Sequence, residues 1–203
     1  AVELEPDTLT TLGNFDYDGQ IQGPITAHPK FDHATGEMVF FGAQAKGQMS
    51  DWLRLNIADK NGKLIRNEMI KAPFASFAHD FFVTQKYVVI PVYPLVFDLD
   101  RAMDGKIPMA WEPHRGTHLA VMPRDGTAAD VQWHTMDPRW SFHMVNAWDE
   151  DGAIKVDVCA SNATDFAPKT DGRVADEGLM PLLRRWSIDV TGRTATVGEE
   201  MLE

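Results

Sequence analysis

Short apolar runs separated by glycine-containing turns constrain this chain more than any other feature. Trp52 to Ile57 is followed by the turn Asp59-Lys60-Asn61-Gly62 and then by a second run, Leu64 to Ile70. The Asn-Gly pair supplies the positive φ angles that a tight hairpin requires, so these residues predict two antiparallel strands. The same arrangement recurs at the turns that contain Gly36, Gly126, Gly152 and Gly192. We therefore expect an all-β protein.

Helices have little room in this sequence. Proline or glycine interrupts almost every window of helical length, and only Leu99 to Asp104 and Leu179 to Leu183 could form a helical turn or two. The stretches Ile107 to Gly116 and Thr164 to Pro181 are predicted to be long loops, which on a β scaffold often form the rim of a binding site. Strands at short spacing favour a sandwich, a barrel or a propeller over alternating β-α units.

Charge and composition exclude several classes of protein. The 203 residues carry a formal net charge of −11, which would repel a phosphate backbone, so nucleic acid is not expected as a partner. No apolar run approaches the roughly 18 residues of a membrane helix, so no membrane span is expected. The single cysteine, Cys159, cannot form an intrachain disulfide and is predicted to be a small buried side chain. A cytoplasmic location is the default interpretation.

Three of the seven histidines share one sequence context. His28 lies in Ala27-His28-Pro29-Lys30, His79 in Ala78-His79-Asp80-Phe81 and His143 in Phe142-His143-Met144-Val145. Each stands at the end or start of a strand-like run, and they are 51 and 64 residues apart. Such steps match one propeller blade of about 40–50 residues plus a loop. A histidine at the equivalent place in successive blades would point at a common axis, where imidazoles suit iron, zinc, copper or nickel.

Two other interpretations of these histidines remain open. A single histidine beside phenylalanine is usually a hydrogen-bonded, partly buried side chain, so the three could belong to the core of a non-enzymatic β-rich binding module. Three histidines are also the ligand set of zinc hydrolases, in which the pKa of the metal-bound water is lowered toward about 7. Of the remaining histidines, His33 is expected to be exposed, His114 and His118 to lie in a loop, and His134 to be structural.

Several segments together resemble the carotenoid cleavage oxygenases, and within that family the bacterial lignostilbene dioxygenases. The resemblance follows the family's order and spans nearly the whole chain. It is carried by Ala27 to Asp32 with Thr35-Gly36-Glu37, Ala78 to Phe81 with Thr84, Phe142-His143 with Val145-Asn146-Ala147, and Leu183 to Trp186 with Asp189.

The resemblance implies a seven-bladed β-propeller whose axis holds a non-haem Fe(II) ion (Fe²⁺) on four histidines. Carried over to this sequence, His28, His79 and His143 are implied to be three of the iron ligands. The implied reaction is oxidative cleavage of a carbon–carbon double bond to two carbonyl products. The implied partners are dioxygen and a small hydrophobic substrate, either a stilbene-like aromatic phenylpropanoid or a carotenoid polyene. No organic cofactor is implied.

The chain also departs from the family pattern. The fourth histidine, and a glutamate that orients a ligand imidazole, would lie beyond Glu203, and another such glutamate would lie before Ala1. Seven blades of about 40–50 residues require roughly 300 residues, so this length holds about four. We therefore expect residues 1–203 to form a single incomplete propeller domain that is inactive or nearly so by itself. Its open edges are expected to be covered by the remainder of the propeller or by a second copy in a homo-oligomer.

Overall fold

The computed structural model describes residues 1–202 as a set of antiparallel sheets, three of which have four strands. The first sheet contains β3 (Lys30–Phe31), β4 (Met38–Gly42), β5 (Trp52–Ala58) and β6 (Leu64–Lys71). The second contains β7 (Phe82–Val83), β8 (Tyr87–Val92), β11 (Thr117–Pro123) and β12 (Gln132–Met136). The third contains β13 (Met144–Glu150), β14 (Ala153–Ala160), β15 (Leu182–Asp189) and β16 (Gly198–Met201).

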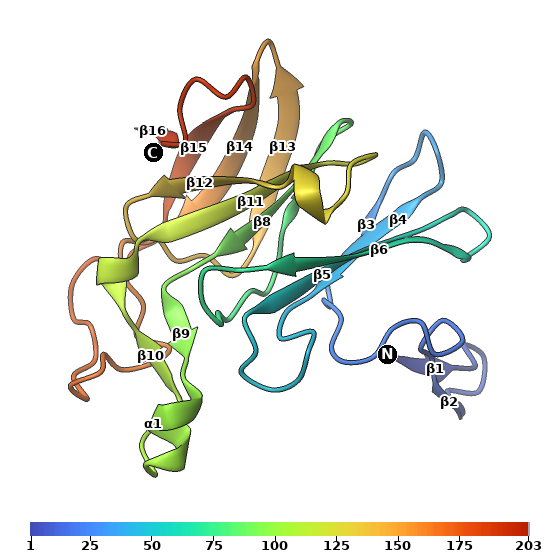
Figure 1. The fold of residues 1–203 in the computed structure, drawn as a ribbon, viewed down its shortest axis with the longest axis horizontal. Coiled ribbons are helices and arrows are strands. Elements are labelled where there is room, and N and C mark those ends of the chain that lie inside the picture. The colour runs from blue at the N-terminus through green and yellow to red at the C-terminus, as the bar shows by residue number, and fades with distance from the viewer. Residues whose placement is uncertain (203) are drawn as a thin grey trace.

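Two hairpins project from this framework (Figure 1). One joins β1 (Val2–Leu4) to β2 (Thr11–Asn14), and the other joins β9 (Leu95–Phe97) to β10 (Met109–Trp111). The second hairpin carries the short helix α1 (Leu99–Met103), whose N-terminus is capped by Asp98 through a hydrogen bond from the Arg101 amide. Single 3-10 turns occur at η1 (Pro113–Arg115) and η2 (Ala128–Asp130). No helix in the described chain has the length and apolarity needed to cross a bilayer.

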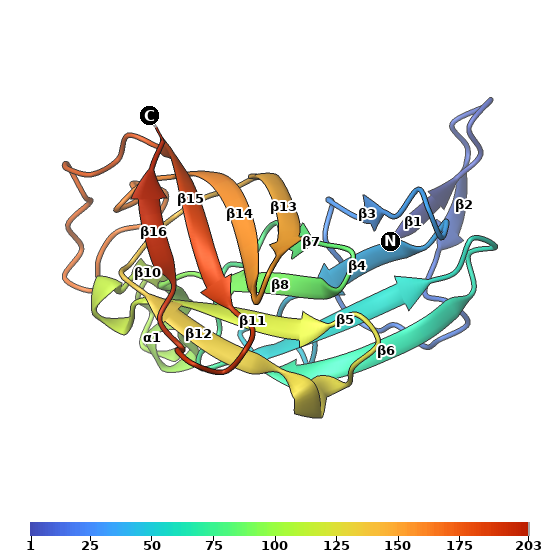
Figure 2. The same ribbon diagram turned by 90° about the horizontal axis from the view of Figure 1, so that it is seen from above.

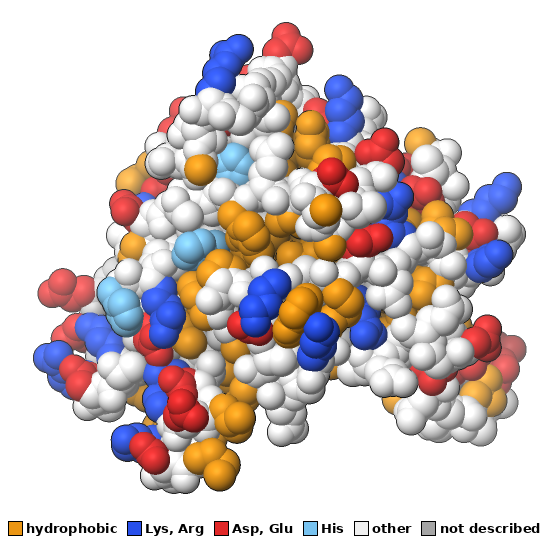
Figure 3. All heavy atoms as spheres, in the orientation of Figure 1, with side chains coloured by type: hydrophobic (Ala, Val, Ile, Leu, Met, Phe, Trp, Pro, Cys, Tyr) orange, Lys and Arg blue, Asp and Glu red, His pale blue; other side chains and the backbone are white. Residues whose placement is uncertain are grey.

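The sheets pack face against face, and the cores lie between them. In Figure 2 they follow one another across the molecule in chain order, from the sheet of β3 to β6, through the sheet of β7, β8, β11 and β12, to the sheet of β13 to β16. Leu55 and Ile90 belong to the core between the first and second sheets. Leu119 and Trp186 belong to the core between the second and third. On the face shown in Figure 3, acidic and basic side chains are interspersed.

The expected all-β, partial propeller architecture is confirmed. Turn glycines adopt the predicted left-handed conformation, with φ of 80° at Gly62 and 75° at Gly152. The length of the chain suggests about four blades. The described part contains three four-stranded sheets, because the remaining length forms the two hairpins and the loops. The predicted helical turn at 99–104 is present as α1.

Three local predictions outside the histidines are wrong. Residues 179–183 contain no helix, because Leu182 and Leu183 pair with Ala160 and Cys159 as the start of β15. The predicted loop at 107–116 contains β10, which pairs with β9. Cys159 is exposed, because the alternation of β14 directs Val156, Val158 and Ala160 into the core and turns Cys159 to the other face.

Candidate metal centre

Each of the three histidines precedes the first strand of a four-stranded sheet. His28 lies two residues before β3, His79 three residues before β7, and His143 directly before β13. All three strands are edge strands of their sheets. Equivalent positions in three successive sheets therefore bring the imidazoles to one place, as the propeller geometry predicts.

The imidazoles converge closely. The Nε2 atoms of His28 and His79 are 2.9 Å apart. The ring centre of His143 lies 4.8 Å from that of His28 and 5.3 Å from that of His79. The candidate ligand nitrogens of all three residues lie within 4.8 Å of one another. In the described part of the chain this is the one cluster of three or more histidine, cysteine or acidic side chains close enough to share a metal ion.

The chemistry of this donor set fits a divalent metal ion. Burial lowers the pKa of His79, and positive charge on His28 or His143 would lower it further, so the neutral His79 ring with a free lone pair is favoured. Two nitrogens bound at right angles to one ion at about 2.1 Å lie about 3 Å apart, close to the separation of the two Nε2 atoms. Neutral imidazole is a good ligand for Fe(II) and for other first-row transition metals.

Hydroxyl groups connect the histidine-bearing segments. The Thr26 hydroxyl accepts a hydrogen bond from the His28 amide at 3.1 Å and donates one to the carbonyl of His79 at 2.9 Å. The hydroxyl of Ser141 donates to the carbonyl of His143 at 2.9 Å. The Thr26 hydroxyl thus joins the segments of His28 and His79, and the Ser141 hydroxyl fixes the backbone locally at His143.

Aromatic rings form a wall beside the histidines. Phe77 stacks on His79 with 6.0 Å between ring centres and 11° between planes. Phe142 meets His79 edge to face at 5.8 Å. Trp140 and Phe166 are nearly parallel, at 14° and 6.2 Å. Such an apolar surface excludes water and suits flat, unsaturated molecules.

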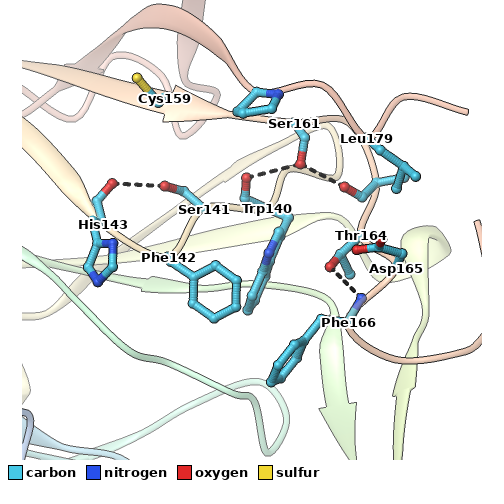
Figure 4. A pocket seen from close by; sticks show the side chains of 12 residues that line it. Trp140, Ser141, Phe142, His143, Cys159, Ser161, Thr164, Asp165, Phe166 and Leu179 are labelled. Carbon is cyan, nitrogen blue, oxygen red and sulfur yellow. Dashed lines mark hydrogen bonds between the residues drawn. The ribbon is translucent and has the colours of Figure 1, made fainter.

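A cavity of about 360 Å³ opens along this wall (Figure 4). His143 lies at one side of it, and residues from the segment before β13, from β14 and from the loop before β15 complete it. Its lining consists of Trp140, Ser141, Phe142, His143, Cys159, Ser161, Ala163, Thr164, Asp165, Phe166, Leu179 and Pro181. The loop from Thr164 to Pro181 therefore forms part of a rim, as its sequence predicts.

The other histidines lie elsewhere. His33 and His114 are exposed. His118 is part of β11 rather than a loop, because its backbone pairs with Val92 and Thr135, and its ring lies against Phe74. His134 is buried on β12, and neither of its ring nitrogens has a hydrogen-bond partner among residues 1–202.

Sequence reasoning missed Thr26 and the aromatic wall. Phe77 and Phe142 stand within two residues of a candidate ligand, so their spacing was a usable signal. Phe166 lies in a polar loop 23 residues after His143, and no local pattern connects the two.

Comparison with known proteins gives consistent matches over the whole chain. The sequence model of the retinal pigment epithelial membrane protein family matches residues 1–203. The isoeugenol monooxygenase of Pseudomonas putida is 39% identical over 191 residues, which are 93% of this chain and 40% of that protein.

Solved structures of oxygenases also superpose closely on this chain. The crystal structure of the Pseudomonas brassicacearum lignostilbene dioxygenase superposes with a TM-score of 0.92 at 36% identity, covering 99% of this chain and 43% of that one. A cobalt-substituted Synechocystis apocarotenoid oxygenase superposes with a TM-score of 0.78 at 25% identity, covering 98% and 44%. The chain spans about two-fifths of the length of the relatives it matches.

Proposed function

The chain belongs to the retinal pigment epithelial membrane protein family, that of the carotenoid cleavage oxygenases, and on that premise we propose that His28, His79 and His143 hold a non-haem Fe(II) ion. The observation that carries this proposal is the convergence of three imidazoles from the segments that precede three separate sheets. Three neutral donors leave the ion its full charge and further coordination positions. The ion, when bound, supplies activation of dioxygen toward an alkene.

The proposed reaction is oxidative cleavage of a carbon–carbon double bond. An alkene R–CH=CH–R′ and one O₂ give R–CHO and R′–CHO, so the atoms balance and no external reductant is needed. Both oxygen atoms of dioxygen end in the products in this stoichiometry. That makes the proposed activity a dioxygenase reaction that uses iron and no organic cofactor.

The proposed substrate is an aromatic alkene of the stilbene or phenylpropanoid class. Two matched relatives are named for such molecules, isoeugenol and lignostilbene. The wall made by Phe77, Trp140, Phe142 and Phe166 supports the same class, because offset and edge-to-face contacts favour aromatic rings. A carotenoid polyene is the runner-up, in keeping with the apocarotenoid relative.

In this proposal the residues of the chain bind the metal ion, orient the substrate and exclude water. The three histidines hold the ion at the end of the cavity that His143 lines. Phe142 and Phe166 hold the substrate ring and keep water away from the reacting double bond. We also propose that residues 1–203 form a single incomplete propeller domain. This domain contributes three of the four histidines implied by the family resemblance.

The test is cleavage under labelled dioxygen. The purified protein is loaded with Fe²⁺ without oxygen and then given isoeugenol or a 4-hydroxystilbene under ¹⁸O₂. We expect two aldehydes per alkene, both carrying ¹⁸O when they are reduced to alcohols as they form, because a free aldehyde exchanges its oxygen with water. Consumption of the alkene and of oxygen without formation of the two matching aldehydes would contradict the proposed reaction. One equivalent of tightly bound zinc with no oxygen consumption would instead favour the three-histidine hydrolase.

The rate of this reaction is a separate expectation. The 203-residue chain by itself is expected to turn over far more slowly than an ordinary enzyme, for which kcat is about 1–1000 s⁻¹. Turnover in that ordinary range would overturn the expectation of an almost inactive chain and would leave the proposed reaction intact.

A further inference from the structure

A buried carboxylate, that of Asp80, contacts all three segments that carry the candidate ligands. Its Oδ1 atom lies 2.7 Å from the Lys30 ammonium nitrogen and accepts a hydrogen bond from the Phe81 amide at 2.8 Å. Its Oδ2 atom accepts one from the Met144 amide at 3.0 Å. Lys30 follows His28 by two residues, Asp80 follows His79 directly, and Met144 follows His143 directly.

These contacts replace hydrogen bonds that the sheets do not provide. β3, β7 and β13 belong to three different sheets, and no ladder pairs one with another in the described chain. The segments that carry the ligands would otherwise be joined near the cluster by side-chain packing and by the Thr26 hydroxyl. The Asp80 carboxylate therefore contacts the chain at or next to the start of each of the three edge strands.

The burial of Asp80 makes its contacts strong and specific. The side chain is 3% exposed, whereas its partner Lys30 is 33% exposed. A buried carboxylate is tolerated only when it is paired and hydrogen-bonded, and bonds to a charged acceptor are shorter and stronger than neutral ones. An asparagine at this position would keep one oxygen acceptor, for either the Lys30 side or the Met144 amide, and would turn its NH₂ donor toward the other partner, which frees at least one of the strands.

We propose that Asp80 is a positioning residue for the metal centre, whose carboxylate fixes the spacing of the strands after His28, His79 and His143. This inference rests on the proposed metal-binding function. Asp80 does not reach the metal or the substrate; it acts through the backbone of β13 and through Lys30 of β3. The contacts of Asp80 hold the chain just after each histidine, whereas the Thr26 hydroxyl holds it just before His28.

Equilibrium titration of the purified chain with Co²⁺ tests this role, with the visible ligand-field spectrum as a second readout. Asp80→Asn is expected to weaken Co²⁺ binding by about 10–100-fold, the usual cost of losing a group that orients a metal ligand. Its Co²⁺ spectrum is expected to differ from that of the wild type, because the ligand geometry changes. Lys30→Met, at a partly exposed side chain, leaves the Asp80 carboxylate in place and removes its ion pair, together with a cation–π contact to Phe81, and is expected to weaken binding by about 3-fold or more.

Asp149→Asn is the matched control. The Asp149 carboxylate also joins the second and third sheets, through the Thr84 hydroxyl at 2.8 Å and the Lys86 amide at 3.1 Å, but at the far end of β13. Its substitution is expected to lower resistance to urea and to leave Co²⁺ affinity and spectrum unchanged within about 2-fold.

The outcomes separate the two proposals. Folded Asp80→Asn and Lys30→Met chains that bind Co²⁺ like the wild type, with the same spectrum, would overturn the role of Asp80 and leave the metal centre standing. A wild-type chain that binds no Co²⁺ would overturn the metal centre itself. If Asp80→Asn does not fold, Lys30→Met decides the question. Equal losses of affinity in Lys30→Met and Asp149→Asn would also overturn the role, because they would show a general loss of stability.

Discussion

The Nε2 atoms of His28 and His79 lie 2.9 Å apart, although 51 residues separate the two in the chain. Between them the chain completes the whole first sheet, β3 to β6, and returns to the same place. Two imidazole nitrogens at this distance either share a proton or turn two lone pairs toward one ion. The lowered pKa of His79, caused first by burial and then by its two histidine neighbours, favours a neutral His79 ring that is free to bind metal.

Replacing His79 with alanine should remove the metal. Two imidazoles then remain, and the loss of a direct ligand is expected to weaken Fe²⁺ binding by at least about 100-fold, the upper end of the cost of losing an orienting group. Metal analysis after anaerobic loading and gel filtration measures this. His114→Ala, at an exposed histidine outside the cluster, should keep the wild-type metal content. A folded His79→Ala chain that still holds one equivalent of iron would contradict the assignment.

Replacing Phe166 with alanine should weaken binding of an aromatic ligand. The ring is 48% exposed and stacks on Trp140, so its removal opens the cavity without emptying the core. An aromatic pair is worth about 0.5–1.5 kcal/mol, which corresponds to a roughly 2- to 12-fold loss of affinity. Quenching of tryptophan fluorescence by a 4-hydroxystilbene measures it. Val174→Ala, on the same loop but outside the cavity lining, is the control, and equal affinity in both variants would refute the role of Phe166.

Replacing Gly42 with alanine should disturb the segment that leads to His28. A Cβ atom at Gly42 would lie 2.1 Å from the carbonyl oxygen of Pro24, a backbone atom that cannot rotate away. Overpacking of this kind costs about 1–3 kcal/mol of unfolding free energy. We expect urea unfolding to show that loss, together with weaker Fe²⁺ binding.

Gly198→Ala is the control for Gly42→Ala. A Cβ atom at Gly198 would lie 3.6 Å from its nearest neighbour, the Cβ of Ser187, which is an ordinary contact. Its unfolding free energy and metal affinity should stay near those of the wild type. Wild-type stability in Gly42→Ala would show that the Pro24 segment can move.

Replacing His134 with leucine should flatten the pH dependence of stability. Burial lowers the pKa of His134 below its ordinary value of 6.5, opposed only in part by the charge of Asp189. The unfolded chain therefore takes up the proton first, and the wild type loses stability as the pH falls below about 6.5 toward the lower pKa of the folded state.

Urea unfolding at pH 7 and pH 5 measures this effect. The His134→Leu chain should lose less stability between the two pH values than the wild type does. His33→Gln, at an exposed histidine, should keep the wild-type difference. Identical pH dependence in the wild type and His134→Leu would show that His134 does not contribute to it.

Local patterns were enough to predict most of the strands, the tight turns and the candidate ligands. A hairpin such as β5–β6 is specified by neighbouring residues, since Gly62 adopts the positive φ that the turn requires and the flanking runs need only pair with each other. The three histidines could be selected because each stands at the end or start of a strand-like run, at separations that match one propeller blade plus a loop. The resemblance to the oxygenase family rested on those same segments.

Pairing between segments that are distant in sequence decided the features that local patterns did not predict. Leu182 and Leu183 became strand because β14 offered them a partner, and the alternation of that strand turned Cys159 outward.

The sequence by itself determined an all-β chain with three equivalent histidines, because strand pairing and tight turns depend on short-range geometry. Only the tertiary structure decided that the imidazoles meet within 4.8 Å, that Phe166 joins Trp140 beside them, and that Asp80 reaches the Met144 amide. Those contacts join residues 26 to 115 positions apart, and their formation depends on how whole sheets pack.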